Sequence, residues 1–201
     1  MSNEIVYSYK DNVYLNITNK CPCACTFCIR SQKDAIGSAN SLWLEHNPTF
    51  EEVKTALENY PLDNCKEIIF CGYGEPTNSF DVLIKTAKYI RENLKIKTRI
   101  NTNGLGNLVN NKNIARELCE NIDAISISLN CSNKEDYLEI VRPKFGIESF
   151  DAMLDFAKEC KKYTDNVMLS VVDVIGEEEI AKCQKIAEDI NIPLRVRVFS
   201  N

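Results

Sequence analysis

The chain has 201 residues, of which 44% are hydrophobic and 26% charged, as in an ordinary globular domain. Its net charge of −5, from 24 basic and 29 acidic residues, argues against non-specific nucleic-acid binding, because such binding depends on neutralising phosphates. Ten cysteines accompany a single histidine, His46, so chemistry led by imidazole is not expected.

Residues 1–12 are polar and lack a basic region followed by an apolar core, and no apolar run approaches the length of a membrane span. We therefore expect a cytoplasmic protein without a membrane partner. In a reducing compartment, clustered cysteines are better interpreted as metal ligands or redox groups than as disulfides.

Short apolar or β-branched runs alternate along the chain with segments of helical period, which is typical of a parallel sheet built from βα units. Strands are predicted to begin near Val13, Lys66, Lys97, Ala124, Val167 and Leu194. Helices are predicted to begin after Thr49, where Glu52 completes a capping box, and at Ser149 and Glu177. A complete eight-unit barrel needs about 250 residues, so we expect an α/β fold, a partial (βα)6 TIM-type barrel that forms one domain over residues 1–201.

The connection after the first predicted strand is long, and we treat residues 19–47 as a loop that carries chemistry. Its residues 21–28 read CPCACTFC. Cys21, Cys25 and Cys28 have the spacing C-x3-C-x2-C, which suits three ligands of a four-iron cluster and leaves one iron open. Cys23 is assigned as a non-ligand because neighbouring alternating residues of an extended segment point apart. The alternative, a structural zinc site, usually takes two short-spaced pairs from separate segments, and no second pair is present.

This motif, with the aromatic Phe27 before its last cysteine, resembles that of the radical S-adenosylmethionine (SAM) superfamily, and the resemblance extends over nearly the whole chain. The resemblance implies a [4Fe-4S] cluster whose open iron is chelated by SAM. It also implies an enzyme that cleaves SAM reductively to a 5′-deoxyadenosyl radical, which abstracts hydrogen from substrate. An electron donor such as flavodoxin or ferredoxin is expected.

Polar residues after the other strands supply the cofactor contacts that the resemblance implies. The turn Gly72-Tyr73-Gly74-Glu75 is similar to the family's Gly-Gly-Glu-like motif, which receives the amino group of SAM. It departs from that motif at Tyr73, where glycine is commoner. The alternative is a tight turn without a cofactor role, which the same residues would also suit. Strand alternation predicts polar side chains in the barrel lumen. The expected cofactor contacts are Phe27, Gly72, Tyr73, Gly74, Glu75, Asn101, Asn103, Ser126, Ser128, Asn130 and Arg142.

Other residues are assigned to the substrate or to catalysis. Arg195 and Arg197 on the last predicted strand are expected substrate anchors, with solvent exposure at a terminal strand as the alternative. Cys71 and Cys131 follow strands and are candidate hydrogen donors, with packing as the alternative.

The Asn-Ile-Thr-Asn-Lys lead-in at residues 16–20 and the Arg-Pro-x-Phe-Gly segment at 142–146 are similar to those of short radical SAM proteins associated with TatD-type hydrolases. This similarity implies a functional link to such a hydrolase. We expect no auxiliary-cluster domain. The substrate class stays open between a small molecule and, for a glycyl-radical activase, a protein partner. Two alternatives from other classes are an iron–sulfur electron-transfer protein and a zinc-binding adaptor.

Overall fold

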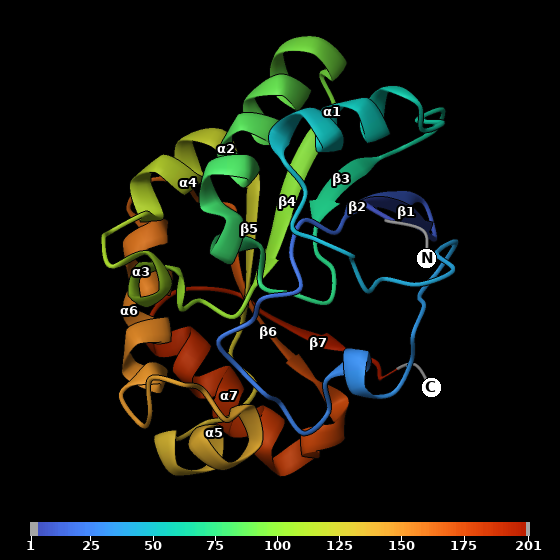
Figure 1. Cartoon of the computed structure of the whole chain (residues 1–201). Helices are drawn as coiled ribbons and strands as arrows, with labels where there is room; N and C mark the ends of the chain where they lie inside the picture. The colour runs from blue at the N-terminus through green and yellow to red at the C-terminus, as the bar shows by residue number, and fades with distance from the viewer. Residues whose placement is uncertain (1–3, 200–201) are drawn as a thin grey trace. The chain divides into compact units, whose positions relative to one another are not determined.

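The computed structural model of the chain describes residues 4–199 (Figure 1). These residues form two compact units. Unit 1 comprises residues 4–21, 28–101 and 120–124, and unit 2 comprises residues 22–27, 102–119 and 125–199. The cysteine loop therefore contributes to both units. The expectation of one domain over the whole chain stays a prediction.

The strands of unit 1 follow one another in chain order: β1 (Val6–Tyr9), β2 (Asn12–Leu15), β3 (Glu67–Phe70) and β4 (Lys97–Thr102). The pairs β2–β3 and β3–β4 are parallel, in agreement with the strands predicted from the sequence. β1 was not predicted. It pairs antiparallel with β2 through a tight turn at Lys10, which has a left-handed φ of 54°.

The helices of unit 1 are α1 (Phe50–Glu58) and α2 (Phe80–Tyr89), which pack against each other, and α2 continues as a π-helical turn over Ile90–Leu94. Short 3-10 turns cover Ile29–Ser31 and Pro76–Ser79. α1 begins at the predicted capping box: the Thr49 hydroxyl accepts the Glu52 N–H, and the Glu52 carboxylate accepts the Thr49 N–H.

Unit 2 holds β5 (Ala124–Ser128), β6 (Val167–Val172) and β7 (Leu194–Arg197), which pair in parallel. Its helices are α3 (Gly106–Asn110), α4 (Ala115–Asn121), α5 (Lys134–Val141), α6 (Ser149–Lys161) and α7 (Glu177–Asp189), with a 3-10 turn over Asp173–Ile175. The boundary between the units falls inside three elements. Thr102, the last residue of β4, belongs to unit 2, whereas Ala124 of β5 and residues 120–121 of α4 belong to unit 1. α6 and α7 pack on β6, and α7 also packs on β7.

The predicted alternation along β5 is confirmed. Ile125 and Ile127 are fully buried, and Ile127 lies in the helix-facing core beside Met153 of α6. Ser126 and Ser128 consequently project from the opposite face, which also carries Ser170 of β6 in register with Ser128. This second face of the unit 2 strands is the polar face on which the sequence placed cofactor contacts.

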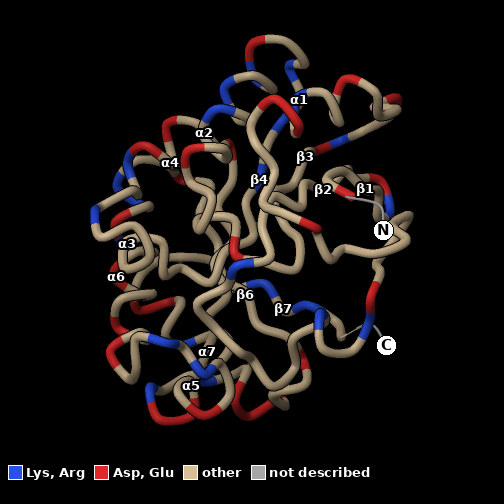
Figure 2. The backbone as a smooth tube through the Cα atoms, viewed as in Figure 1, with Lys and Arg blue, Asp and Glu red and all other residues tan. Residues whose placement is uncertain are grey.

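All six predicted strands exist, and their parallel pairing within each unit confirms the α/β class. The predicted helices at Phe50, Ser149 and Glu177 are also present. Charges of both signs are distributed along the helices of each unit (Figure 2). Among the described residues, no helix has the length and apolarity needed to cross a membrane.

Candidate functional site

The middle of the cysteine loop is attached to the segment that follows α5. The N–H of Thr26 donates to the Ile140 carbonyl over 2.9 Å, the N–H of Ala24 donates to the Val141 carbonyl over 3.1 Å, and the N–H of Lys144 donates to the Pro22 carbonyl over 2.8 Å. Residues 22–26 are therefore fixed by main-chain hydrogen bonds that do not depend on the side chains of the loop.

Cys23 is the most buried cysteine of this loop, with 4% of its surface exposed. Its backbone forms an isolated bridge with Pro143, and its sulfur accepts a hydrogen bond from the Asn103 amide over 3.5 Å. Cys23 is thus held by contacts within unit 2, and its role as a non-ligand stays a prediction.

The other three cysteines of the motif are half-buried thiols, Cys21 and Cys28 in unit 1 and Cys25 in unit 2. Among residues 4–199, no group of three or more His, Cys, Asp or Glu side chains has the arrangement of a finished metal site. The donor chemistry does fit the predicted group, because an iron–sulfur cluster takes cysteine thiolates and all three sulfurs belong to one eight-residue segment.

The turn after β3 packs against the chain that enters the cysteine loop. A Cβ atom on Gly74 would lie 2.1 Å from the Thr18 carbonyl oxygen, and one on Gly72 would lie 2.1 Å from Asn16 Oδ1. The N–H of Glu75 donates to the Lys20 carbonyl over 2.8 Å. Both glycines are thus required by close approach, and the turn supports the start of the loop.

The carboxylate of this turn, Glu75, is buried with 4% of its surface exposed. It accepts the N–H of Thr77 over 3.2 Å and the hydroxyl of Thr77 over 2.8 Å. A buried carboxylate of fixed orientation is a suitable acceptor for a cationic ammonium group, which is the role that the sequence assigned to Glu75.

Tyr73, which stands where the family motif more often has glycine, is also buried. Its hydroxyl donates to the Lys33 carbonyl, and its ring meets Trp43 edge to face with centroids 5.1 Å apart. Burial raises the pKa of Tyr73, and the nearby Asp34 and Cys28 raise it further, so the phenol stays protonated and donates. The side chain therefore anchors residues 33–43 of the cysteine loop.

Asn130 is a predicted cofactor contact whose side chain is buried. It follows β5 with a left-handed φ of 64° and is buried, with 5% of its surface exposed. Its Oδ1 has no hydrogen-bond partner among the described residues, although buried acceptors are nearly always paired. This open acceptor fits a ligand that carries hydroxyl or ammonium donors, as SAM does.

Two other predicted cofactor contacts have partners within the protein. Asn101 Oδ1 accepts from Arg99 Nη1 over 3.2 Å, and Asn103 Oδ1 accepts the Leu105 N–H over 2.9 Å. Arg142 is exposed, with a φ of 50°, and its Nε donates to the Glu139 carbonyl at the end of α5 over 3.2 Å. Its side chain caps its own helix, so its contact with a cofactor stays a prediction.

The candidate substrate and catalytic residues lie in different settings. On β7, Arg195 is exposed and Arg197 is half-buried, and Arg195 is in register with Ser170. The thiol of Cys131 is 1% exposed, and burial, together with nearby Cys183 and Glu179, raises its pKa to about 12. Cys71 is half-buried, and its carbonyl accepts the Tyr7 hydroxyl over 3.1 Å. None of these roles is tested by the contacts.

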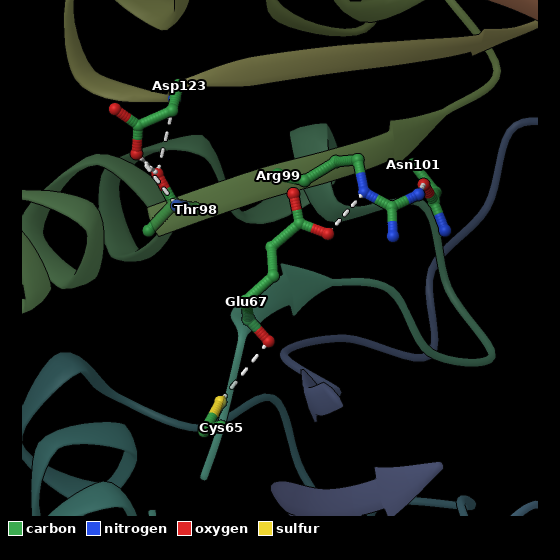
Figure 3. A network of polar contacts seen from close by, with 6 residues as sticks. All are labelled: Cys65, Glu67, Thr98, Arg99, Asn101 and Asp123. Carbon is green, nitrogen blue, oxygen red and sulfur yellow. Dashed lines mark hydrogen bonds and ion pairs between the residues drawn. The ribbon is translucent and has the colours of Figure 1, made fainter. Parts of the chain in front are cut away.

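The structure thus divides the predicted site residues into two sets. Unit 1 holds Cys21, Cys28, Cys71, Gly72, Tyr73, Gly74, Glu75 and Asn101, and unit 2 holds Cys25, Phe27, Asn103, Ser126, Ser128, Asn130, Cys131, Arg142, Arg195 and Arg197. The sequence interpretation missed one polar group in unit 1, the ion pair of Arg99 with Glu67, over 2.8 Å (Figure 3). The position of Arg99 in the middle of a strand could have indicated this ion pair, because a charged side chain that is largely buried requires a partner.

Comparison with known proteins supplies the family. A model of the radical SAM superfamily matches residues 15–190 of the chain. No curated protein matched.

Solved structures resemble the chain at low sequence identity. A radical SAM methyltransferase from Sphaerobacter thermophilus is 16% identical, with a TM-score of 0.58 over 98% of this chain and 69% of that one. The protein anSMEcpe with bound AdoMet and a Cp18Cys peptide is 22% identical, with a TM-score of 0.62 over 92% of this chain and 49% of that one. A polyhistidine-tagged form of anSMEcpe with bound AdoMet gives 22% identity and a TM-score of 0.66 over 94% and 49%. The chain spans about half the length of anSMEcpe, and these likenesses establish the fold.

Proposed function

The chain belongs to the radical SAM superfamily of enzymes, and from this premise we propose that it binds a [4Fe-4S] cluster through Cys21, Cys25 and Cys28 and cleaves SAM reductively. When bound, the reduced cluster would supply the electron that splits SAM into methionine and a 5′-deoxyadenosyl radical. The substrate of that radical is the part of the proposal that the family does not specify.

The observation that carries the proposal is the different treatment of the four cysteines in residues 21–28. Main-chain bonds fix residues 22–26, and the Cys23 sulfur is buried against Asn103. The three remaining thiols are half-buried, so they have access to a ligand, and they have the C-x3-C-x2-C spacing. Cys65 is also half-buried, so it is the spacing within one eight-residue segment that distinguishes these three thiols.

The SAM contacts are proposed for two sets of residues. In unit 1, the buried Glu75 carboxylate would accept the ammonium group of SAM. In unit 2, the open Oδ1 of Asn130 would accept a ribose hydroxyl, with Ser126 and Ser128 on the same face of β5. Each acceptor is already oriented by the fold, which reduces the entropy lost when the cofactor binds.

The proposed reaction requires an electron donor and a substrate. A flavodoxin or ferredoxin would provide the electron, and Arg195 and Arg197 would hold an anionic small-molecule substrate. A protein substrate of a glycyl-radical activase is the alternative, and a stable radical left on a polypeptide would identify it. The similarity to TatD-associated proteins, with the link to a hydrolase, stays a prediction.

Anaerobic reconstitution with iron and sulfide tests the cluster. We expect about four irons per chain and an electron paramagnetic resonance signal of the reduced protein that changes when SAM is added. Cys25→Ala is expected to lose the signal, whereas Cys65→Ala, a half-buried cysteine outside the motif, retains it. Zinc in place of iron would instead favour the adaptor. A signal that SAM leaves unchanged would favour the electron-transfer protein.

A further inference from the structure

One face of the unit 1 strands carries a polar cluster in which Asn101 is the one member named above as an expected cofactor contact. Tyr14 of β2, Ile69 of β3 and Arg99 of β4 lie in one row, because Tyr14 is in register with Ile69 and Ile69 with Arg99. Side chains alternate along a strand, so Glu67 and Asn101 share this face. The neighbouring residues Thr98 and Ile100 are buried on the opposite face.

Arg99 is held in a fixed position within this cluster. Figure 3 shows Arg99 between Glu67 and Asn101. The Nε of Arg99 donates to Glu67 Oε2 over 2.8 Å and its Nη1 donates to Asn101 Oδ1 over 3.2 Å. Only 13% of the Arg99 side chain is exposed. The strand beneath it is fixed as well, because the Asp123 carboxylate accepts both the N–H and the hydroxyl of Thr98. Arg99 is therefore preorganised by both a charge partner and its backbone.

The Arg99 guanidinium keeps donors that the cluster does not use. Among the described residues, Arg99 Nη2 and Asn101 Nδ2 have no hydrogen-bond partner, and a guanidinium has five N–H donors in a planar fork. Neither donor is among the fully buried polar atoms of the described residues, so both are accessible to a ligand. Arg99 and Asn101 are joined through the 3.2 Å hydrogen bond, and each keeps a donor that can reach one oxygen of a carboxylate.

We propose that Arg99 and Asn101 bind a carboxylate group of the substrate, with Glu67 as the positioning residue for Arg99. A carboxylate fits better than a phosphate, because Glu67 already cancels the charge of Arg99 and would repel a dianion. The inference rests on the proposed function only for the identity of the ligand as substrate. The anion site itself exists or fails independently of SAM chemistry.

The test is a titration of the anaerobically purified full chain, without SAM or reductant, followed by nuclear magnetic resonance of the arginine Nε–H groups. Sodium acetate is the probe, and sodium chloride at matched ionic strength is the reference. We expect a saturable, acetate-specific shift of the Arg99 signal, which Arg99→Lys identifies by removing it. Arg91, an exposed arginine that donates to Glu120 and Asn121, is the control and is expected not to shift.

Glu67→Gln is expected to strengthen acetate binding, whereas Arg99→Lys is expected to remove the signal. The Glu67→Gln variant keeps the hydrogen-bond acceptor for Arg99 and removes the competing negative charge, so acetate is expected to bind about threefold more tightly or better. A merely structural ion pair predicts no acetate-specific shift in the wild type or in Glu67→Gln, and that result would overturn the proposal. Tighter binding of inorganic phosphate than of acetate to the wild type would overturn the choice of a carboxylate.

Discussion

The side-chain amide of Asn103 donates to the sulfur of Cys23 over 3.5 Å. Both residues lie in unit 2, and this contact joins the cysteine loop to the turn that follows β4. The turn is itself fixed, since Asn103 Oδ1 accepts the Leu105 N–H and the Thr102 hydroxyl accepts the Gly104 N–H. The sulfur of Cys23 therefore has a structural task, whereas Cys25, two residues away, is a proposed cluster ligand.

This difference predicts opposite results for two cysteine variants. Cys23→Ala removes a buried sulfur and its hydrogen bond, so we expect the free energy of unfolding to fall by about 1 kcal/mol while iron binding is retained. Cys25→Ala is expected to lower the iron bound after reconstitution with little effect on the fold of the metal-free chain. Iron content and urea unfolding of both variants check this. Equal loss of iron from the two would assign Cys23 to the cluster.

Asn130 is predicted to contribute to SAM binding through its open Oδ1. Asn130→Gly removes the amide and suits the left-handed backbone, so we expect a folded protein that binds SAM about tenfold more weakly. Asn191→Gly, at an exposed position with a φ of 52°, is the matched control and is expected to bind SAM normally. Isothermal titration calorimetry with SAM measures both. Unchanged affinity in Asn130→Gly would remove this residue from the site.

Tyr73 is predicted to act as the anchor of the cysteine loop. Tyr73→Gly restores the residue commoner in the family motif but deletes the contacts with Lys33 and Trp43. We expect faster proteolytic cleavage and faster amide exchange in residues 29–44, while Tyr73→Phe, which keeps the ring, has a smaller effect. Exchange rates in this loop that match the wild type would show that the loop is held by other contacts.

The start of α1 gives a pH-dependent prediction. Hydrogen bonds from the backbone N–H of Thr49, the Thr49 hydroxyl and His46 lower the pKa of Glu52 from 4.5 to about 2. A carboxyl group whose pKa is lower in the folded state stabilises the fold above pH 4.5, and this contribution is lost as the pH falls toward 2. Glu52→Gln is therefore expected to flatten the dependence of unfolding free energy on pH between 4.5 and 2.

Thr49→Ala tests the same capping box at neutral pH. We expect it to lower the free energy of unfolding by about 1 kcal/mol, because a helix N–H loses its acceptor. Thr49→Ser keeps a hydroxyl and is expected to retain most of the stability. A Thr49→Ala protein with unchanged stability in urea unfolding would mean that solvent satisfies the helix terminus equally well.

Local patterns predicted most of the elements. The alternation of Ile125, Ser126, Ile127 and Ser128 records which side of β5 faces the helices, and the Thr49 capping box marks a helix start, because both signals arise from neighbouring residues. β1 has only four residues and belongs to no βα unit, so periodicity did not reveal it.

Features that depend on contacts distant in sequence were not predictable in the same way. The sequence did not indicate that the Arg142 side chain caps α5 or that the Ile140 and Val141 carbonyls beside it hold the cysteine loop. Main-chain contacts of this kind leave no residue-specific signal. The role of Tyr73 likewise depends on where Lys33 and Trp43 fold, 40 and 30 residues earlier in the chain.

The central claim is that this chain, with its cluster in place, cleaves SAM reductively. The most direct measurement is 5′-deoxyadenosine, quantified by mass spectrometry after the anaerobically reconstituted protein is mixed with SAM and dithionite. We expect the wild type to form 5′-deoxyadenosine and Cys28→Ala to form none. A wild-type preparation that contains about four irons per chain and binds SAM, yet forms no 5′-deoxyadenosine, would contradict the account.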